Sequence, residues 1–283
     1  MPLEEDKMPA NWTEQPQESD AKIHMAAFEE KMKAYRAQDR LEEIDKELNN
    51  EHLKPDAPWG LAVYRTCYDD EVGWQKMREH LETRVRESLE YYVNDGMLQR
   101  HRFVFMDDKT QFDGASPAKV RDHFEQWAKE ELARNWAAQP VTEEMRHDMY
   151  GPPDNPDNGA LSWAGTRYHV CVLIDDVCLL SLDENRVGPI FMLVNKDFGI
   201  PHEITEDNEH PDYEDGWMVD HNEGPGGWIY VRSSEYVETY NALHDRNEWG
   251  EDDRFMYPSM VYGDMGLERS PAFWREEVAA KKG

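Results

Sequence analysis

The sequence has few cysteines and no long run of apolar residues. Its 283 residues include three cysteines, Cys67, Cys171 and Cys178, with no C-x-x-C spacing. This pattern predicts neither a disulfide framework nor a zinc site, and it is typical of a reducing compartment. No segment approaches the roughly 20 apolar residues of a membrane span, and the acidic start, MPLEEDKMPANWTEQPQESD, is unlike a signal peptide. We therefore expect a cytoplasmic protein with no membrane partner.

Positive charge is also scarce. The chain has 31 Lys and Arg residues against 60 Asp and Glu residues, which gives a formal net charge of −29. Proteins that bind nucleic acids gain affinity by neutralising phosphates with basic side chains, and an acidic surplus of this size repels those phosphates. The composition therefore argues against a nucleic-acid partner. The same surplus favours a basic protein partner, because opposite charges steer association.

Motifs for nucleophilic catalysis and for nucleotide binding are absent. The sequence contains no G-x-S-x-G, no G-x-x-x-x-G-K-[ST] and no H-E-x-x-H. The cysteines lie inside apolar runs, where burial raises the pKa of a thiol. The sequence therefore indicates no catalytic serine or cysteine, and no pattern in it identifies a cofactor.

Aromatic residues, in contrast, are abundant, with 10 Trp, 13 Tyr and 9 Phe. Large rings dominate the burial of apolar surface, so they predict a folded core in spite of the high charge. We expect four regions: a disordered acidic tail (1–18), a helical extension (19–57), an α+β domain (58–245) and an irregular C-terminal segment packed on that domain (246–283). A helix over 19–48 should pack on the domain through Met25, Phe28 and Met32.

The residue patterns within the domain predict strands that alternate with long helices. The predicted strands cover residues 59–68, 102–106, 168–174, 177–182, 190–194 and 228–231. Asp69-Asp70 and Ser116-Pro117 are typical starts of the first two helices. This order predicts an α+β fold with an antiparallel-rich or mixed sheet and helices on one face. Ferredoxin-like topology is its nearest simple description.

Two predicted strands end in paired carboxylates, Asp107-Asp108 after FVFM and Asp175-Asp176 after VCVLI. Carboxylates on neighbouring strands can hold divalent metal ions that bind phosphate oxygens. Asp is also a common turn residue whose side chain bonds its own backbone. A hairpin turn is therefore the favoured interpretation, and a metal site is the alternative.

A second candidate metal site lies in the stretch from Asp197 to Tyr230, which contains no Lys or Arg. It holds ten carboxylates and three histidines, His202, His210 and His221. Imidazole and carboxylate groups at this density can bind a divalent ion, although their spacing matches no known zinc-protease motif. A solvated acidic loop is the favoured interpretation, and a docking surface for a basic partner is a further alternative.

Several large side chains stand at strand starts or in the adjoining loops. The candidates for binding a small apolar ligand are Trp59, Tyr64, Arg65, Trp163, Tyr168 and Trp228. Rings at the rim of a sheet can line a ligand pocket, but they can equally belong to the core, which is favoured. Arg65 lies among apolar residues of its strand. It can bind a substrate carboxylate, and pairing with an internal Asp or Glu is favoured.

Four segments, WGLAVYRTCYDD, HRFVFMDD, SPAKVRDHFEQW and RYHVCVLID, resemble a large group of intracellular proteins of filamentous fungi. These proteins open with a Trp-Gly-x-x-Val-Tyr-Arg strand followed by a helix, and later carry an Arg-Tyr strand. The resemblance covers roughly residues 58–235. It implies a fungal, cytoplasmic protein, and it brings no activity, cofactor or catalytic residue to this chain.

Two functional hypotheses follow. The first is a non-catalytic module that binds a protein or a small apolar ligand, because catalytic motifs are absent while Trp and Tyr are plentiful. The second is a divalent-metal-dependent enzyme that acts on a small substrate with phosphate or carboxylate groups through the strand-end Asp pairs.

Overall fold

A computed structural model describes most of the domain predicted from the sequence. The described residues are 41–151, 159–184, 188–196 and 227–244, with the short pieces 25, 27–32, 224–225, 256–257, 261–262 and 268–269. The predicted tail (1–18) and most of the acidic stretch, with His202, His210 and His221, lie outside these residues.

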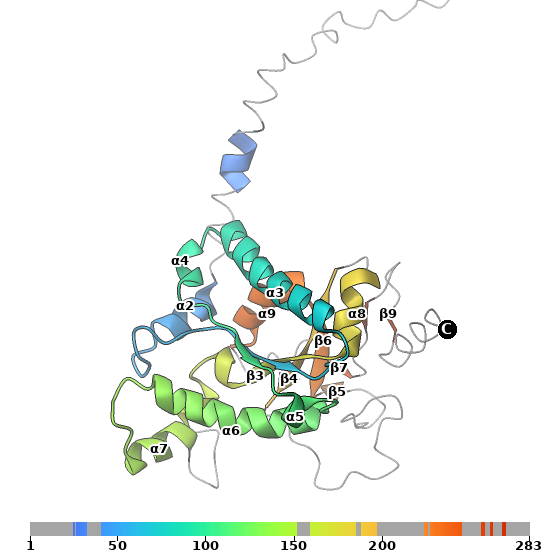
Figure 1. Ribbon diagram of the computed structural model, residues 1–283. Helices are drawn as coiled ribbons and strands as arrows, with labels where there is room; N and C mark the ends of the chain where they lie inside the picture. The colour runs from blue at the N-terminus through green and yellow to red at the C-terminus, as the bar shows by residue number, and fades with distance from the viewer. Residues whose placement is uncertain are drawn as a thin grey trace, which may run out of the picture.

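A five-stranded mixed sheet, with strand order β2-β1-β3-β4-β6, organises the fold (Figure 1). Its strands are β1 (Ala62–Arg65), β2 (Val104–Met106), β3 (Val170–Ile174), β4 (Ile190–Asn195) and β6 (Trp228–Arg232). Strands β2, β1 and β3 are parallel to one another, whereas β4 is antiparallel to both β3 and β6. Two small antiparallel pairs join β5 (Gly224–Pro225) with β7 (Met256–Tyr257), and β8 (Val261–Tyr262) with β9 (Glu268–Arg269).

Helices make up the rest of the described regular structure. The α-helices are α2 (Glu42–Leu48), α3 (Glu71–Tyr91), α4 (Asp95–Leu98), α5 (Lys109–Phe112), α6 (Pro117–Asn135), α7 (Glu143–Tyr150), α8 (Asp176–Glu184) and α9 (Tyr236–Ala242). Short 3-10 helices are η2 (Ala160–Ser162), η3 (Thr166–Tyr168) and η5 (Ser233–Glu235). In the described part of the chain, no helix is long and apolar enough to span a membrane.

The two long helices begin where the sequence predicts. Asp70 accepts a hydrogen bond from the Gly73 N–H (2.7 Å) and caps α3, and Ser116 caps α6 with Pro117 as its first residue. Along α3 the apolar residues recur every three or four positions and are buried, from Trp74 to Leu89. Local capping and periodicity are therefore sufficient to predict these two elements.

Helices cover both faces of the sheet, so the predicted mixed α+β class is confirmed but the expectation of helices on one face is wrong. Helix α3 packs with α8 and α9, while α6 packs with α7 and against β3 and β4 (Figure 1). The β1–β2 crossover runs outward along the sheet, and the β2–β3 crossover runs back past β1. Right-handed crossovers in opposite directions place their helices on opposite faces. Because these strands are parallel, the ferredoxin-like description is not confirmed.

The segment predicted as a strand at 177–182 forms helix α8 instead. Asp175 accepts a hydrogen bond from the Cys178 N–H (2.8 Å), as an N-terminal helix cap does. The Asp175-Asp176 hairpin turn is therefore wrong, because the pair connects a strand to a helix. A short, continuously apolar run does not distinguish a buried strand from a buried helix by periodicity.

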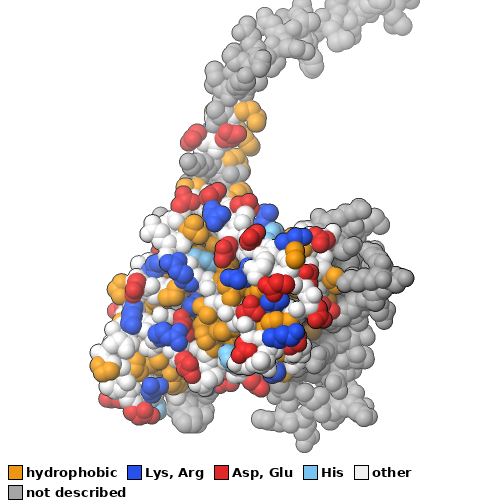
Figure 2. Space-filling model, in the orientation of Figure 1, with side chains coloured by type: hydrophobic (Ala, Val, Ile, Leu, Met, Phe, Trp, Pro, Cys, Tyr) orange, Lys and Arg blue, Asp and Glu red, His pale blue; other side chains and the backbone are white. Residues whose placement is uncertain are grey.

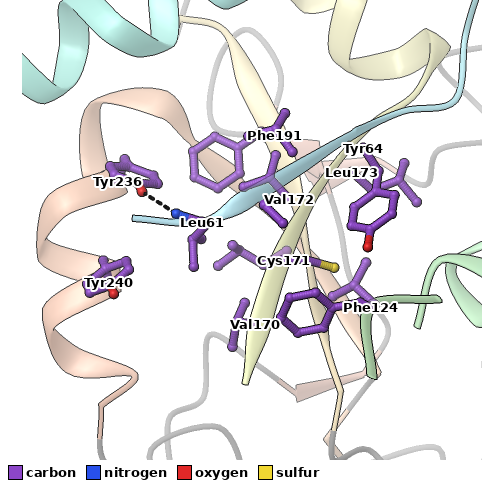
Figure 3. Packing of buried hydrophobic residues seen from close by; sticks show 14 of the residues in the cluster. Leu61, Tyr64, Phe124, Val170, Cys171, Val172, Leu173, Phe191, Tyr236 and Tyr240 are labelled. Atoms are coloured by element: carbon purple, nitrogen blue, oxygen red, sulfur yellow. Dashed lines mark hydrogen bonds between the residues drawn. The ribbon is translucent and has the colours of Figure 1, made fainter. Parts of the chain in front are cut away.

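The core lies on both sides of the sheet. Tyr64 and Cys171 point toward Phe124 of α6, while Phe191 packs near Tyr236 of α9 on the opposite side (Figure 3). All five side chains are buried. Burying one large apolar side chain contributes about 1.5–3 kcal/mol, so this packing is a major source of stability.

The N-terminal extension docks through a different stripe from the predicted one. Leu41 and Ile44 are buried, and the Asn241 side chain of α9 accepts hydrogen bonds from the N–H groups of Glu43 and Ile44 (3.1 and 3.2 Å). Met25 and Phe28 are 60% and 61% exposed. The predicted docking through these two residues is therefore wrong, because the second apolar stripe of the segment reaches the domain.

Candidate functional site

The carboxyl ends of β1, β2 and β3 lie side by side at the same end of the sheet, since these strands are parallel. An Asp pair follows each strand, namely Asp69-Asp70, Asp107-Asp108 and Asp175-Asp176. The structure thus gathers the two pairs proposed as metal ligands, together with a third pair. Ligands and substrates of α/β proteins commonly bind at the carboxyl ends of the parallel strands, which makes this end of the sheet the first candidate site.

Asp107 is held by two donors of the same chain. Its carboxylate accepts a hydrogen bond from Trp74 Nε1 (3.0 Å) and lies 3.4 Å from Arg65 Nη1. Arg65 also lies 2.8 Å from Glu71, and its guanidinium stacks over the Tyr68 ring at 4.3 Å. The favoured interpretation of Arg65, an internal ion pair, is therefore confirmed.

The other strand-end carboxylates act as helix caps. Asp108 accepts hydrogen bonds from the Thr110 hydroxyl and N–H (2.7 and 2.9 Å) at the start of α5, which keeps the pKa of Asp108 below its usual value. Buried Asp175 caps α8 and also accepts a hydrogen bond of 2.5 Å from the Tyr230 hydroxyl. Asp176 is the first residue of α8. Each of these contacts is structural.

These contacts leave the metal hypothesis without a described ligand set. In the part of the chain that the structure describes, no group of three His, Cys, Asp or Glu side chains is placed to hold a metal ion. The candidates His202, His210 and His221 lie outside that part.

The aromatic candidates are mostly core residues. Trp59, Tyr64, Tyr168 and Trp228 are at most 4% exposed, whereas Trp163 is 42% exposed. The indole N–H of Trp59 donates to the Met97 carbonyl (2.8 Å). The favoured core interpretation thus holds for four of these five rings, and the structure does not bring them together around one site.

The described cysteines are not activated as nucleophiles. Burial raises the pKa of the half-buried Cys67, and it raises the pKa values of the fully buried Cys171 and Cys178 further. A raised pKa lowers the thiolate fraction at neutral pH, so the prediction from the sequence agrees with the structure.

A serine–histidine pair that the sequence does not reveal joins α3 to the end of β6. His80 Nε2 and Ser233 Oγ share a hydrogen bond of 2.7 Å, and burial lowers the pKa of His80. Ser233 is only 2% exposed. A substrate therefore cannot reach the Ser233 hydroxyl. The hydrogen bond instead connects α3 to η5.

The amino ends of β1 and β3 carry a buried ionic network that sequence reasoning also missed. Arg167 Nη2 lies 2.8 Å from Glu131 Oε1, and the two side chains are 1% and 6% exposed. Asn135 Nδ2 donates to both Glu131 Oε1 (3.1 Å) and the Tyr168 hydroxyl (3.2 Å). Arg167 further donates to the Gly60 carbonyl. A buried charge is stabilised only when partners of this kind surround it.

Glu47 of α2 lies close to this network. The Tyr240 hydroxyl lies 2.9 Å from both Glu47 carboxyl oxygens, and burial raises the pKa of Glu47 to about 8. Gly165, whose φ is +138°, leaves room for the carboxyl group, because a Cβ at this position would overlap it. The Glu47–Tyr240 contact therefore helps to hold α2 on the domain.

The most accessible feature of the sheet is its β2 edge. Arg102 and Val104 donate their N–H groups to the Trp59 and Leu61 carbonyls of the adjoining chain (2.9 and 3.2 Å). Successive residues of a strand turn their backbone groups to opposite sides, so those of Phe103 and Phe105 point away from β1. Within the described residues, neither Phe makes a backbone hydrogen bond on that open side. Among the described residues, the backbone donors and acceptors of Phe103 and Phe105 therefore have no strand partner.

The side chains around this edge combine apolar and charged groups. The residues of β2 are half-buried, and the Arg78 guanidinium lies 4.3 Å from the Phe105 ring centre. Strand β2 runs between α3 and α6, and the corresponding surface shows apolar side chains between basic and acidic ones (Figures 1 and 2). Arg102 precedes the strand, and Asp107 and Asp108 follow it. The edge is thus basic at one end and acidic at the other.

No protein-family model, curated protein or solved structure matches this chain. The resemblance to intracellular fungal proteins therefore stays a prediction.

Proposed function

We propose that the protein is a non-catalytic, cytoplasmic binding module that adds an extended segment of a protein partner to the free edge of β2. The observation that carries this proposal is the outward orientation of the Phe103 and Phe105 backbone groups. An added strand would satisfy these donors and acceptors, and the half-buried β2 side chains would contribute apolar contact.

The chemistry of the described residues favours binding over catalysis. Asp107, Asp108 and Asp175 are each engaged by donors of the chain itself, and the thiols have raised pKa values. The alternative of a divalent-metal-dependent enzyme draws no support from these carboxylates. A small apolar ligand is also less well supported, because four of the five candidate rings are buried in the core.

The net charge of −29 adds a preference among partners. An acidic protein attracts basic proteins over long distances, so a basic partner associates faster at low salt. The β2 strand itself is apolar in the middle, with Arg78 over the Phe105 ring, and its flanking residues are charged.

A periodicity experiment tests the proposal. Peptides that bind the full-length protein are selected from a displayed random library, and one is synthesised with a single N-methyl group at each position in turn. Methylation at alternate residues should weaken binding about tenfold or more, because every second amide donates to β2. Methylation at the intervening residues should have little effect, which provides the matched control.

Hydrogen exchange locates the bound peptide on the protein. The amides of Phe103 and Phe105 should exchange more slowly in the complex, whereas the amide of Val63, inside the sheet, should be unchanged. A methylation profile without a two-residue period, or unprotected Phe103 and Phe105 amides, would contradict strand addition at this edge.

A further inference from the structure

The β2 edge is complementary to itself when two copies run antiparallel. Arg102 stands at the basic end and is exposed, and within the described part of the chain it forms no ion pair. Its Nη1 donates to the carbonyl of the preceding residue. Asp107 and Asp108 stand at the acidic end, beyond the apolar strand. An antiparallel neighbour with the same sequence therefore brings opposite charges together at both ends.

Backbone hydrogen bonding restricts the register of such a pair. Residues with outward backbone groups must lie opposite one another, so Phe103 or Phe105 must face an outward residue of the second copy. When the two-fold axis passes through Phe105, that residue faces its own counterpart and Arg102 lies opposite Asp108 in both halves. Asp108 has an extended backbone, with φ −114° and ψ 100°, so strand pairing can reach it. Its carboxylate accepts hydrogen bonds from Thr110 and Gln111 at the start of α5, and Oδ2, which accepts only from Gln111, has room for a further donor.

The neighbouring register is less favourable. A shift of two residues would place Arg100 opposite Asp108. Arg100 already donates to the Ala57 carbonyl through Nε (2.9 Å) and to the Leu48 carbonyl through Nη1 (2.7 Å). Its guanidinium is thus committed to the chain's own backbone, whereas that of Arg102 reaches the surface.

We infer that the partner strand is β2 of a second copy of this chain, which gives a two-fold symmetric dimer with one continuous sheet. The inference rests on the strand addition proposed above and names its partner. The interface is isologous, so each Arg102–Asp108 contact occurs twice. Strand β2 contains no Pro or Lys, the residues with which natural edges commonly block such pairing.

The sign of the salt dependence separates this partner from a basic protein. Two copies with a net charge of −29 each repel one another over long distances, and added salt screens that repulsion beyond a Debye length of about 8 Å at physiological ionic strength. Self-association should therefore strengthen as salt is raised toward the physiological range. Association with a basic protein should weaken over the same range.

Charge exchange across the interface tests the register. In sedimentation velocity at micromolar concentration and physiological salt, the full chain should have twice the mass of the 33.3 kDa monomer. Arg102→Glu should reduce the dimer affinity at least about tenfold, because it creates two like-charge contacts. The double variant Arg102→Glu/Asp108→Lys should recover most of the dimer.

Lys76→Glu is the matched control, with the same change in net charge on the part of α3 that faces Asp183. It should remain dimeric. A monomeric wild-type chain, a dimeric Arg102→Glu variant, or a folded double variant that stays monomeric would each overturn the inference.

Hydrogen exchange on the wild type keeps the test valid if Asp108→Lys unfolds α5, which Asp108 caps. The amides of Phe103 and Phe105 should exchange more slowly at high protein concentration than at low concentration, and equal rates would overturn the inference. If the chain is monomeric but selected peptides still bind with a two-residue period, the inference that the partner is a second copy of the chain is wrong, and the proposed strand addition stands. If no peptide binds with that period, strand addition itself fails.

Discussion

The two ends of the parallel strands use the same pair of chemical groups in different surroundings. At the amino ends, Arg167 and Glu131 pair with side chains that are 1% and 6% exposed. At the carboxyl ends, Arg65 is 5% exposed, but its partners Asp107 and Glu71 are 34% and 65% exposed. At the amino ends both members of the central pair are buried, and only Arg134, which also pairs with Glu131, is exposed; at the carboxyl ends the acidic partners themselves are in contact with solvent.

We expect burial, rather than the presence of an ion pair, to decide how much the free energy of unfolding falls when one partner is removed. Removing one partner of a buried pair leaves an uncompensated charge in a low-dielectric interior, which is costly. An exposed carboxylate that loses its partner is solvated by water instead, at little cost. The predictions below test this contrast in order of expected size.

The largest effect is expected at the amino-end network. Arg167→Met should lower the free energy of unfolding by about 3–5 kcal/mol, because Glu131 loses its buried cation and keeps only Arg134, whose side chain is 62% exposed. Urea unfolding at pH 7 measures this loss. The double variant Arg167→Met/Glu131→Leu should be more stable than the single variant, and an equally unstable double variant would show that lost packing, not the unpaired charge, is responsible.

The next effect concerns the place where Glu47 meets the domain. Gly165→Ala should destabilise the protein by more than the roughly 1–3 kcal/mol of backbone strain, because the added Cβ also overlaps the Glu47 carboxyl group. Gly188→Ala is the matched control, with a φ of +105° and open space around the added Cβ. Thermal unfolding of both variants separates strain from overlap. Equal losses would argue against the overlap.

A pH effect should follow from Glu47 and His101. The folded-state pKa of Glu47 is raised to about 8, so stability falls as pH rises from its unfolded value near 4.5 to about 8. The folded-state pKa of His101 is lowered to about 3, mainly by burial, so stability falls as pH drops from about 6.5 to 3. Between about pH 4.5 and 6.5 the contributions of Glu47 and His101 to the pH dependence of stability have opposite signs. Above pH 6.5 only the first of these two effects, that of Glu47, remains.

The melting temperature should therefore decline between pH 6.5 and 8, and Glu47→Gln should flatten this decline. High salt should leave the Glu47 effect in place, because a buried group is screened little. A Glu47→Gln variant with the same pH profile as the wild type would show that another group causes the decline.

The smallest effects are expected at the open end. Asp107→Ala should cost about 1–2 kcal/mol, because Trp74 Nε1 loses its acceptor while Arg65 keeps Glu71. Glu71→Gln should be indistinguishable from the wild type in urea unfolding, because its side chain is solvated. A loss at Asp107 as large as that at Arg167 would contradict the contrast between the two ends.

Particular elements show how far sequence reasoning reaches. Helices α3 and α6 were predictable because Asp70, Ser116 and Pro117 mark their starts and the apolar residues keep one face. Helix α8 was not, because its apolar run has no helical period and its cap, Asp175, is equally common in turns. The pairing of Arg65 was predictable from its apolar neighbours, although its partner Asp107 was not.

The residues of the candidate site divide in the same way. The sequence indicates carboxylates after β2 and β3, but the cap positions that engage Asp108 and Asp175 depend on the helices that follow. The openness of β2 depends on its place at the sheet edge. No local pattern distinguishes HRFVFMDD as an edge strand from a central one, because strand order is a long-range property.

By itself, the sequence determined the mixed α+β class, the long capped helices and the absence of activated thiols. These properties depend on residues within a few positions of one another, or on composition. Tertiary structure alone decided the parallel strand order, the two-sided helix layers, the buried Arg167–Glu131 pair and the position of β2 at the edge of the described sheet. Glu47 and Tyr240, for example, are 193 residues apart in the chain and meet only after folding. Such contacts form because burial of distant apolar surfaces brings polar groups together, and no local pattern encodes their partners.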